Sequence, residues 1–251
     1  FDQVGEGDGV YATRIRSTVA NKHGFRNGAL SANRISLSRM WVQTLGTGSP
    51  IYFPYEGPEV NLMYNSKFDQ LRLTSDTANA LHIANSFSLS IRNTWAESNA
   101  GHSFFINGGN TTFVESCYAL KCGPDKAGYR SLAGGAFVSC NGLNSGGTNF
   151  WFGGTASDAG DVNPGNYIFG AQLINCNCED FSRFGLKLQT QGTLDMYGGK
   201  FARNNAASTY IAAVHADGTI NARFHGNPRD DMAGTRRAEA SEGIASPLGA
   251  D

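Results

Sequence analysis

The sequence predicts an all-β protein: a single-stranded right-handed parallel β-helix, in which short strands wind into a solenoid. Three observations predict this fold. Apolar residues two positions apart recur at a near-constant interval, short phrases of sequence repeat, and 32 glycines among 251 residues follow no Gly-X-Y period. Frequent Gly, Asn and Ser indicate many tight turns between short strands.

Apolar residues two positions apart indicate the buried face of a strand, because alternate side chains of a strand point the same way. One series is Leu71/Leu73, Leu89/Ile91, Phe113 with Val114, Phe137 with Val138, Leu173 with Ile174, and Leu194/Met196. A second series is Leu81/Ile83, Phe104/Ile106, Leu186/Leu188 and Ile211/Ala213. The near-constant interval predicts two or three strands per coil, and stacked coils bury a core that no coil buries alone.

The phrases at 112–119, 137–141 and 173–178 are similar to one another, as expected of successive coils. The Leu-x-x-Leu-x-Leu pattern of leucine-rich repeats does not recur, and few stretches show helical periodicity. We expect residues 1–32 to form an N-terminal cap or lead-in and 33–226 the β-helix, with a lateral insertion or half-coil at 142–166. Residues 227–251 lack a strand period, which predicts a C-terminal linker, cap or disordered tail.

The composition argues against several classes of function. Lys and Arg (20) nearly balance Asp and Glu (21), so nucleic-acid binding is not expected. No apolar run approaches the ~20 residues of a membrane span, so membrane insertion is not expected. The N-terminus lacks a signal-peptide pattern and a starting Met, so we expect a processed chain or a piece of a longer protein.

The five cysteines, at 117, 122, 140, 176 and 178, show no recognised metal-ligand spacing. We interpret them as buried thiols that pack as small hydrophobic groups, with a metal site and a disulfide as the alternatives. No dinucleotide, P-loop or nucleophile-elbow motif is present, so we expect no cofactor.

Thr-Phe-Val-Glu-Ser-Cys-Tyr-Ala-Leu-Lys-Cys (112–122) and Ala-Gly-Tyr-Arg (127–130) resemble coils of the pectate-lyase-like β-helix superfamily, most of all bacteriophage tailspikes. Gly-Asp-Gly-Val (7–10) is similar to that superfamily's opening phrase, although Tyr-Ala-Thr follows here instead of Thr-Asp-Asp. The resemblance covers about 33–226. It implies a homotrimer that binds, and often cleaves, capsular polysaccharide or O-antigen.

Sugar cleavage needs carboxylates, and glycoside hydrolysis uses two at a defined separation. Registering the coils on their apolar residues predicts one outward column of Arg72, Arg92, Glu115 and Asn175, followed by Asp76, Glu97 and Asp180. We hypothesise that Glu97, Glu115 and Asp180 include a catalytic acid/base pair and that Arg92 holds the sugar. The alternative is that these are solvated surface charges paired with nearby Arg and Lys.

Aromatic side chains are the second candidate feature, since their faces stack on sugar rings. Trp95 and Tyr118 follow the first strand of adjacent coils, and core or corner packing is their alternative role. Phe150, Trp151 and Phe152 cannot all point inward from a strand, so we expect an outward side chain, with Trp151 a candidate for sugar binding or a subunit contact.

The resemblance therefore implies a phage tailspike-type receptor-binding protein that binds and cleaves bacterial surface polysaccharide, as a hydrolase or a lyase. The alternative is a non-catalytic β-helix shaft or sugar-binding adhesin, and a secreted polysaccharide lyase is the third possibility. The expected location is the phage tail of the virion, acting at the bacterial surface, or else secretion. The expected partners are the polysaccharide and two further copies of the chain.

Overall fold

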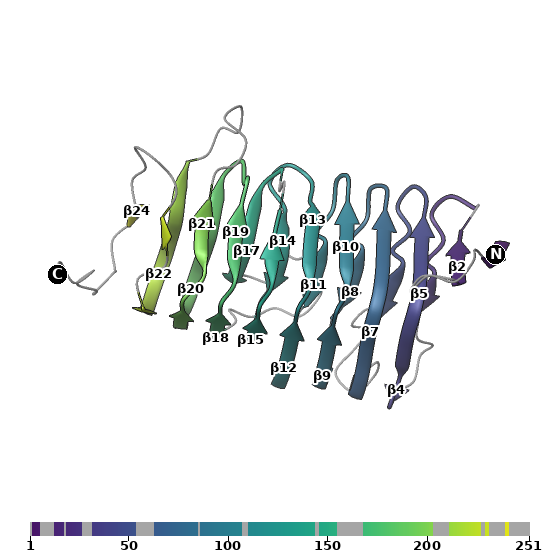
Figure 1. Ribbon diagram of the computed structural model, residues 1–251, viewed down its shortest axis with the longest axis horizontal. Helices are drawn as coiled ribbons and strands as arrows, with labels where there is room; N and C mark the ends of the chain where they lie inside the picture. The colour runs from purple at the N-terminus through teal and green to yellow at the C-terminus, as the bar shows by residue number, and fades with distance from the viewer. Residues whose placement is uncertain are drawn as a thin grey trace.

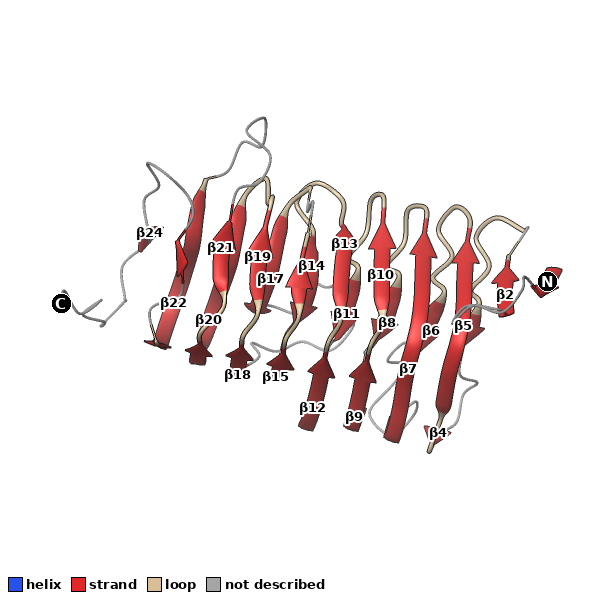
Figure 2. Cartoon of the chain, viewed as in Figure 1, coloured by secondary structure: helices blue, strands red, loops and turns tan. Residues whose placement is uncertain are grey.

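The chain winds into a parallel β-solenoid of about seven turns in the computed structural model (Figure 1). The structure describes residues 2–5, 13–17, 19–26, 32–53, 63–84, 86–106, 110–143, 146–154, 168–202, 211–226, 229–230 and 239–240. Across these ranges there are strands and loops but no helix (Figure 2). The predicted all-β solenoid is confirmed, and its parallel pairings are consistent with the right-handed sense.

Strands from successive coils pair in three stacks, which we call A, B and C. Stack A contains β3 (Phe25–Arg26), β6 (Ile51–Phe53), β8 (Leu81–Ile83), β11 (Phe104–Ile106), β14 (Ala127–Ser131), β17 (Thr148–Gly153), the first parts of β20 (Phe184–Tyr197) and β22 (Ala212–His225), and β24 (Glu239–Ala240). Stack B contains β4 (Ala32–Asn33), the first parts of β5 (Ser36–Thr44) and β7 (Met63–Ser75), β9 (Ser86–Arg92), β12 (Asn110–Glu115), β15 (Gly134–Val138), β18 (Ile168–Ile174), and the second parts of β20 and β22.

Stack C contains β2 (Thr13–Arg16), the second parts of β5 and β7, β10 (Trp95–Ser98), β13 (Tyr118–Lys121), β16 (Asn141–Gly142), β19 (Asn177–Glu179), β21 (Lys200–Ala202) and β23 (Arg229–Asp230). β1 (Asp2–Gly5) pairs antiparallel with β2, whereas every other pairing among the described strands is parallel. In Figure 1, stacks B and C face the viewer and β8, β11, β14 and β17 of stack A lie behind them.

The core is built from inward side chains that lie directly over their equivalents in the next coil. Stack B contributes Phe68, Ile91, Val114, Phe137, Leu173, Met196 and Phe224. Stack A contributes Ile51, Leu81, Phe104, Tyr129, Phe150, Leu186 and Val214. Because all of these except the half-buried Phe224 are buried, the core runs through the whole solenoid.

The register corrects part of the expected repeat. Leu73 lies under Ala96 of stack C and not under Ile91, because β7 continues through a corner and serves two stacks. Val138 and Ile174 face outward while their neighbours fill the core. The expected inward position of Ile211 is also wrong, since Ile211 is exposed and Val214 lies over Leu186 in the core column.

The corner between stacks B and C is one residue wide in each coil and requires a positive φ. Its residues are Arg39, Gln70, Asn93, Ser116, Ser139, Asn175, Gly198 and Gly226. The amide of Ser139 donates to the carbonyl of Ile174 at 2.8 Å, and its equivalents in the neighbouring coils make the same bond, so the corner stays within the inter-coil hydrogen-bond ladder. The corner therefore favours side chains that tolerate the left-handed region.

The cysteines pack inside the solenoid as predicted, since all five are buried and free. Cys117, Cys140 and Cys176 follow the corner residue of three successive coils. The Cys140 thiol lies 3.5 Å from the Val114 carbonyl oxygen, and burial raises the pKa of the Cys140 and Cys176 thiols well above the ordinary value. Low thiolate content makes these groups unreactive packing elements.

The aromatic triplet within 142–166 forms a regular strand of stack A. In β17, Phe150 and Phe152 face the core and Trp151 faces outward, which confirms the expectation of an outward side chain. Residues 155–167, the phrase at 7–10 and most of 227–251 lie outside the described residues. No helix in the described part of the chain is long and apolar enough to cross a membrane.

We predict that Ser139→Val destabilises the protein while Ser139→Gly does not. Ser139 has a φ of 52°, a region where a β-branched side chain is strained and Gly is not, so the two variants should differ by about 2 kcal/mol in the free energy of unfolding. Urea denaturation measures this difference. Ser90→Val, at an ordinary strand position of β9, is the matched control and should be tolerated. Equal stability of the two Ser139 variants would contradict the assignment of Ser139 to the corner.

Candidate functional site

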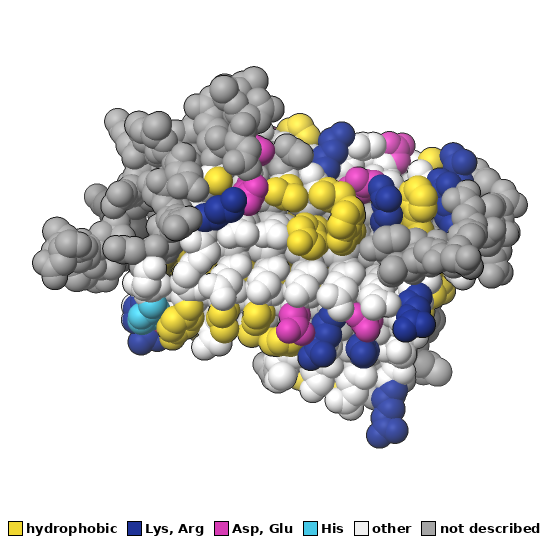
Figure 3. All heavy atoms as spheres, viewed as in Figure 1, with side chains coloured by type: hydrophobic (Ala, Val, Ile, Leu, Met, Phe, Trp, Pro, Cys, Tyr) yellow, Lys and Arg dark blue, Asp and Glu magenta, His cyan; other side chains and the backbone are white. Residues whose placement is uncertain are grey.

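The outward face of stack C carries one ladder of aromatic and basic side chains, which we call the stack C ladder. Its members occupy equivalent positions in successive coils, so neighbours are separated by the strand spacing of ~4.8 Å. They are Arg14, Trp41, Arg72, Trp95, Tyr118, Asn141, Asn177 and Lys200. Figure 3 views this face, where hydrophobic, basic and acidic side chains gather over β5, β7, β10 and β13.

Trp41 anchors the N-terminal part of the ladder. The guanidinium of Arg14 lies 3.9 Å from its ring centroid and that of Arg72 lies 4.6 Å away. The indole Nε1 donates to Thr74 Oγ1 at 3.1 Å. Both cations are attracted to the electron-rich ring, so Trp41 holds Arg72 in place rather than offering a free face to a ligand.

Glu97 lies beside this anchor and completes a hydrogen-bonded chain across three coils. Thr74 Oγ1, which accepts from Trp41, donates to Glu97 Oε1 at 3.0 Å. Arg72 Nη2 lies 4.0 Å from the same carboxylate oxygen. The carboxylate is thus oriented by a hydroxyl and a guanidinium while its side chain remains 30% exposed.

Trp95 and Tyr118 form the exposed aromatic part of the ladder. Their ring centroids are 5.4 Å apart and their planes are inclined by 53°. Trp95 is 38% exposed, whereas most large hydrophobic side chains of the described residues are buried. The register places these two side chains next to each other in successive coils, and their role in sugar binding remains a prediction.

A second outward column, on stack B, lies across the corner from the stack C ladder. It runs through Asp69, Arg92 and Glu115 and then becomes apolar at Val138 and Ile174. Arg92 Nε lies 3.2 Å from Glu115 Oε2. Both side chains are more than one-third exposed, so this ion pair orders the surface more than it stabilises the fold.

The predicted acidic residues are not brought into one cluster. Glu97 pairs in register with Thr74 and Lys121, whereas Glu115 pairs with Arg92 and Val138 on the other side of the corner. Asp180 follows β19, three coils beyond Glu97.

The predicted column of Arg72, Arg92, Glu115 and Asn175 is also divided. Arg92 and Glu115 are neighbours, Arg72 belongs to the stack C ladder, and Asn175 occupies a corner with a φ of 51°. The physical reason is the left-handed corner residue, which separates positions that a simple apolar spacing aligns.

Trp151 lies on stack A, away from Trp95 and Tyr118. Lys187 Nζ and the Arg130 guanidinium flank its ring, 3.8 Å and 4.2 Å from the centroid. Its indole Nε1 donates to Gln189 Oε1 at 2.8 Å. Trp151 therefore belongs to a separate ladder on the non-core side of stack A, in which Phe105 and Arg130 are buried. The other members are Tyr52, His82 and Lys187.

Histidines are built into this stack A ladder in their neutral form. The His82 ring lies between Tyr52 and Phe105, with centroid distances of 4.9 Å and 4.6 Å. Burial lowers the pKa of His82 from 6.5 to about 4, and a smaller effect comes from the charge of His23. His102 Nδ1 accepts from the amide of Ala127 at 2.8 Å, and burial, followed by the Arg130 charge, holds its pKa well below the ordinary value.

No group of three or more His, Cys, Asp or Glu that could hold a metal ion is found in the described ranges. Sequence reasoning missed Trp41, Thr74 and Arg72 as members of the Glu97 environment. Counting back by one coil length from Trp95 and Glu97 would have found Arg72 and Thr74.

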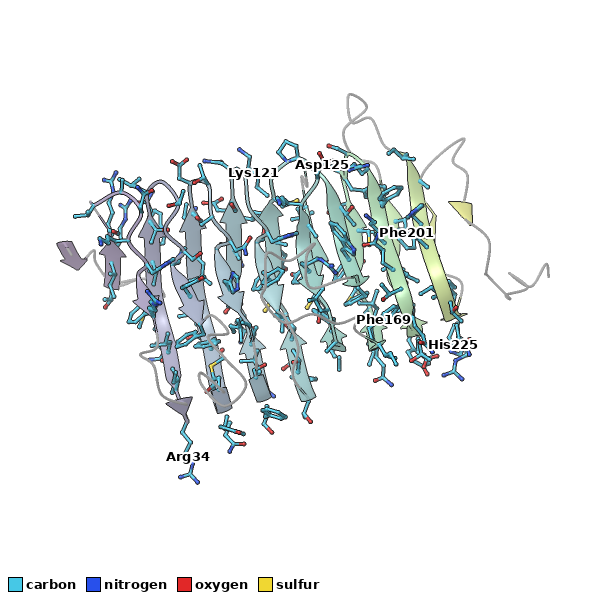
Figure 4. All side chains as sticks on the ribbon, turned by 180° about the vertical axis from the view of Figure 1, so that it is seen from behind. Arg34, Lys121, Asp125, Phe169, Phe201 and His225 are labelled. Carbon is cyan, nitrogen blue, oxygen red and sulfur yellow. The ribbon has the colours of Figure 1, made fainter. Side chains whose placement is uncertain are left out.

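Figure 4 shows the molecule from behind, with Lys121 and Asp125 along the edge that borders the stack C ladder.

We predict that the protein loses stability as the pH falls from about 6.5 to about 4. In this range the unfolded chain binds a proton at His82 that the folded chain excludes, which lowers the free energy of unfolding by up to about 3 kcal/mol. Urea denaturation at pH 7.5 and pH 4.5 measures the loss. His82→Phe keeps an aromatic ring in the ladder and should show a smaller loss; an unchanged loss would contradict the assignment.

No family model matches the chain, and no curated protein or solved structure matches it.

Proposed function

We propose that this solenoid binds an extended bacterial surface polysaccharide, capsule or O-antigen, along the stack C ladder. The observation that carries the proposal is the exposed, inclined pair Trp95 and Tyr118, with the oriented Glu97 and Arg72 beside it. Aromatic faces stack on the apolar faces of sugar rings, and planar carboxylate and guanidinium groups exchange hydrogen bonds with sugar hydroxyls.

The geometry of the face favours a long ligand over a small one. Equivalent outward positions recur every ~4.8 Å along the solenoid, so a chain molecule meets similar groups in successive coils. Beyond Tyr118 the ladder continues as Asn141, Asn177 and Lys200, and Asn177 Nδ2 donates to Asn141 Oδ1 at 2.6 Å. Amides offer both donors and acceptors to hydroxyl groups.

The finer proposal is a phage tailspike-type receptor-binding protein that works as a homotrimer on the virion. It is supported by the β-solenoid fold together with the resemblance of residues 112–122 and 127–130 to tailspike coils. A non-catalytic shaft or adhesin uses the same fold, so the two proposals separate on glycan binding and cleavage.

We predict that Trp95→Ala weakens polysaccharide binding by about tenfold or more, because it removes the stacking surface. The measurement is isothermal titration or biolayer interferometry against a panel of capsules and O-antigens. Ile211→Ala removes an exposed apolar side chain elsewhere and is the matched control. Undiminished affinity of the Trp95 variant for a glycan that binds the native protein would rule out this ladder as the binding face.

Cleavage of the bound glycan is the second candidate function, and one observation favours it. The Glu97 carboxylate accepts a hydrogen bond from Thr74 and lies next to the exposed Trp95. A carboxylic acid in this position can protonate a glycosidic oxygen. Glu115 lies on stack B, across the corner and paired with Arg92, so the proposal rests on Glu97. Hydrolysis adds water across the glycosidic bond, whereas a lyase would leave an unsaturated sugar.

We predict that Glu97→Gln lowers the rate of oligosaccharide release by about a hundredfold or more while binding persists, because the amide cannot transfer the proton. Mass spectrometry of the products distinguishes hydrolysis from elimination. Asp180→Asn, three coils away, should retain the activity. Full activity of the Glu97 variant would exclude this residue from catalysis, and no release by the native protein from any glycan that it binds would favour the shaft or adhesin function.

A further inference from the structure

Stack B contains a shallow depression in the C-terminal half of the solenoid, away from the stack C ladder. Its volume is about 290 Å³, and its lining comes from β15, β18 and β20. Gly135, Ala136, Gly170 and Ala171 leave its floor with almost no side chains. The volume lies just below the ~300–1,000 Å³ typical of ligand sites, so the depression fits one small unit and not a large cofactor.

Polar side chains stand along one wall of this depression. They are Gln172 on β18 and Thr193 and Asp195 on β20. Together they offer amide donors and acceptors, a hydroxyl and a carboxylate. In register, Gln172 lies beside Asp195 and Gly170 lies beside Thr193, and the Thr193 hydroxyl borders the open space above Gly170.

The carboxylate of Asp195 is fixed by two neighbours in the next coil. Arg223 approaches both oxygens, with Nε 2.7 Å from Oδ1 and Nη2 donating to Oδ2 at 2.7 Å. His225 Nε2 lies 3.4 Å from Oδ1. The Arg223 hydrogen bond is the main cause of the lowered pKa of Asp195, so the carboxylate stays ionised and the pair carries no net charge. A fixed, neutral pair favours an uncharged polar ligand over an ion.

An aromatic side chain borders the same region. Tyr197 is 41% exposed, and its ring stacks on that of His225 with centroids 4.4 Å apart and planes inclined by 8°. His225 lies at the outer edge of the solenoid in Figure 4. The polar wall is therefore adjacent to an ordered aromatic surface, a combination suited to a polyhydroxylated ring with polar edges and apolar faces.

We infer that this depression is a second sugar subsite, which takes one uncharged sugar unit against Gln172, Thr193 and Asp195. The inference rests on the proposed function for the chemical class of its ligand. The depression is centred on β18, three coils beyond β9, whose coil carries Trp95, so the two sites are roughly 14 Å apart along the solenoid axis at ~4.8 Å per coil. One polysaccharide chain that crosses the corner from stack C to stack B contacts both, and the second contact raises the overall affinity.

Gly170 allows the depression to be filled without disturbing the fold. A Cβ atom built there meets only Thr193 Oγ1, at 3.8 Å, and its φ is not positive. By contrast, Gly134 and Gly135 have φ values of 92° and 131° and close backbone neighbours. Gly170→Tyr is therefore the test variant. Thr219→Tyr, at an exposed position of β22 outside the lining, is the matched control, and thermal unfolding confirms that both are folded.

The experiment titrates methyl glycosides of glucose, galactose, rhamnose and N-acetylglucosamine into ¹⁵N-labelled protein. With at least one sugar we expect the amide signals of Gly170, Gln172 and Thr193 to shift in the native protein and in Thr219→Tyr. The Gln172 and Thr193 signals should not shift in Gly170→Tyr. The same variant should bind the full polysaccharide about tenfold more weakly than the native protein.

The outcomes separate the two proposals. If the amides of Trp95 and Tyr118 shift but those around Gly170 do not, the stack C site stands and the second subsite is overturned. If neither group shifts with any sugar and no polysaccharide binds, both proposals are overturned. Shifts around Gly170 that persist in Gly170→Tyr also overturn the subsite, because the filled depression cannot hold the sugar.

Discussion

The hydrogen-bond ladder between coils is the constraint on which the rest of this structure depends. Every strand of stacks A, B and C pairs in parallel with its equivalent one coil away, so each side chain is placed over a fixed partner. Inside, this register turns single apolar residues into continuous columns such as Phe68, Ile91 and Val114. Outside, the same register produces the ladders that carry Trp95 and Trp151. Core and surface are thus two sides of one pairing pattern.

The fold could be predicted from the sequence because stacking leaves a direct periodic signal. Apolar positions such as Leu81 and Phe104 recur at the coil length, and stacking of the coils buries them together. The surface register was harder to predict, because it depends on where the corner falls. Gln70 and Asn93 turn the chain by a positive φ that leaves no apolar signature in the sequence. Apolar spacing alone therefore aligns Leu71 with stack B, although Leu71 lies in stack C. That one shift moved Arg72 into the wrong outward column.

The candidate site was predictable in its types of residue but not in its geometry. Arg92 and Glu115 do occupy outward positions on neighbouring coils, as the strand spacing indicated, and the register also places Trp95 beside Tyr118. The contacts that orient Glu97 come from Thr74 on the preceding coil, and a sequence offers no sign that a threonine hydroxyl will bridge an indole and a carboxylate. Such contacts depend on side-chain rotamers, which follow from the complete three-dimensional environment.

The constant length of the central coils has a consequence for how such a protein can evolve. Because each coil contacts only its neighbours, the energy of the solenoid is close to a sum of local terms. Between Phe68 and Phe137 the spacing is kept unchanged, so an in-frame duplication of one coil leaves every other column in register. Longer coils keep the columns too, since Phe137 lies over Leu173 and Met196 over Phe224 although more residues separate them. Genetic change can therefore lengthen or shorten the outer surface in whole coils, and single-residue substitutions on that surface can vary independently of the core.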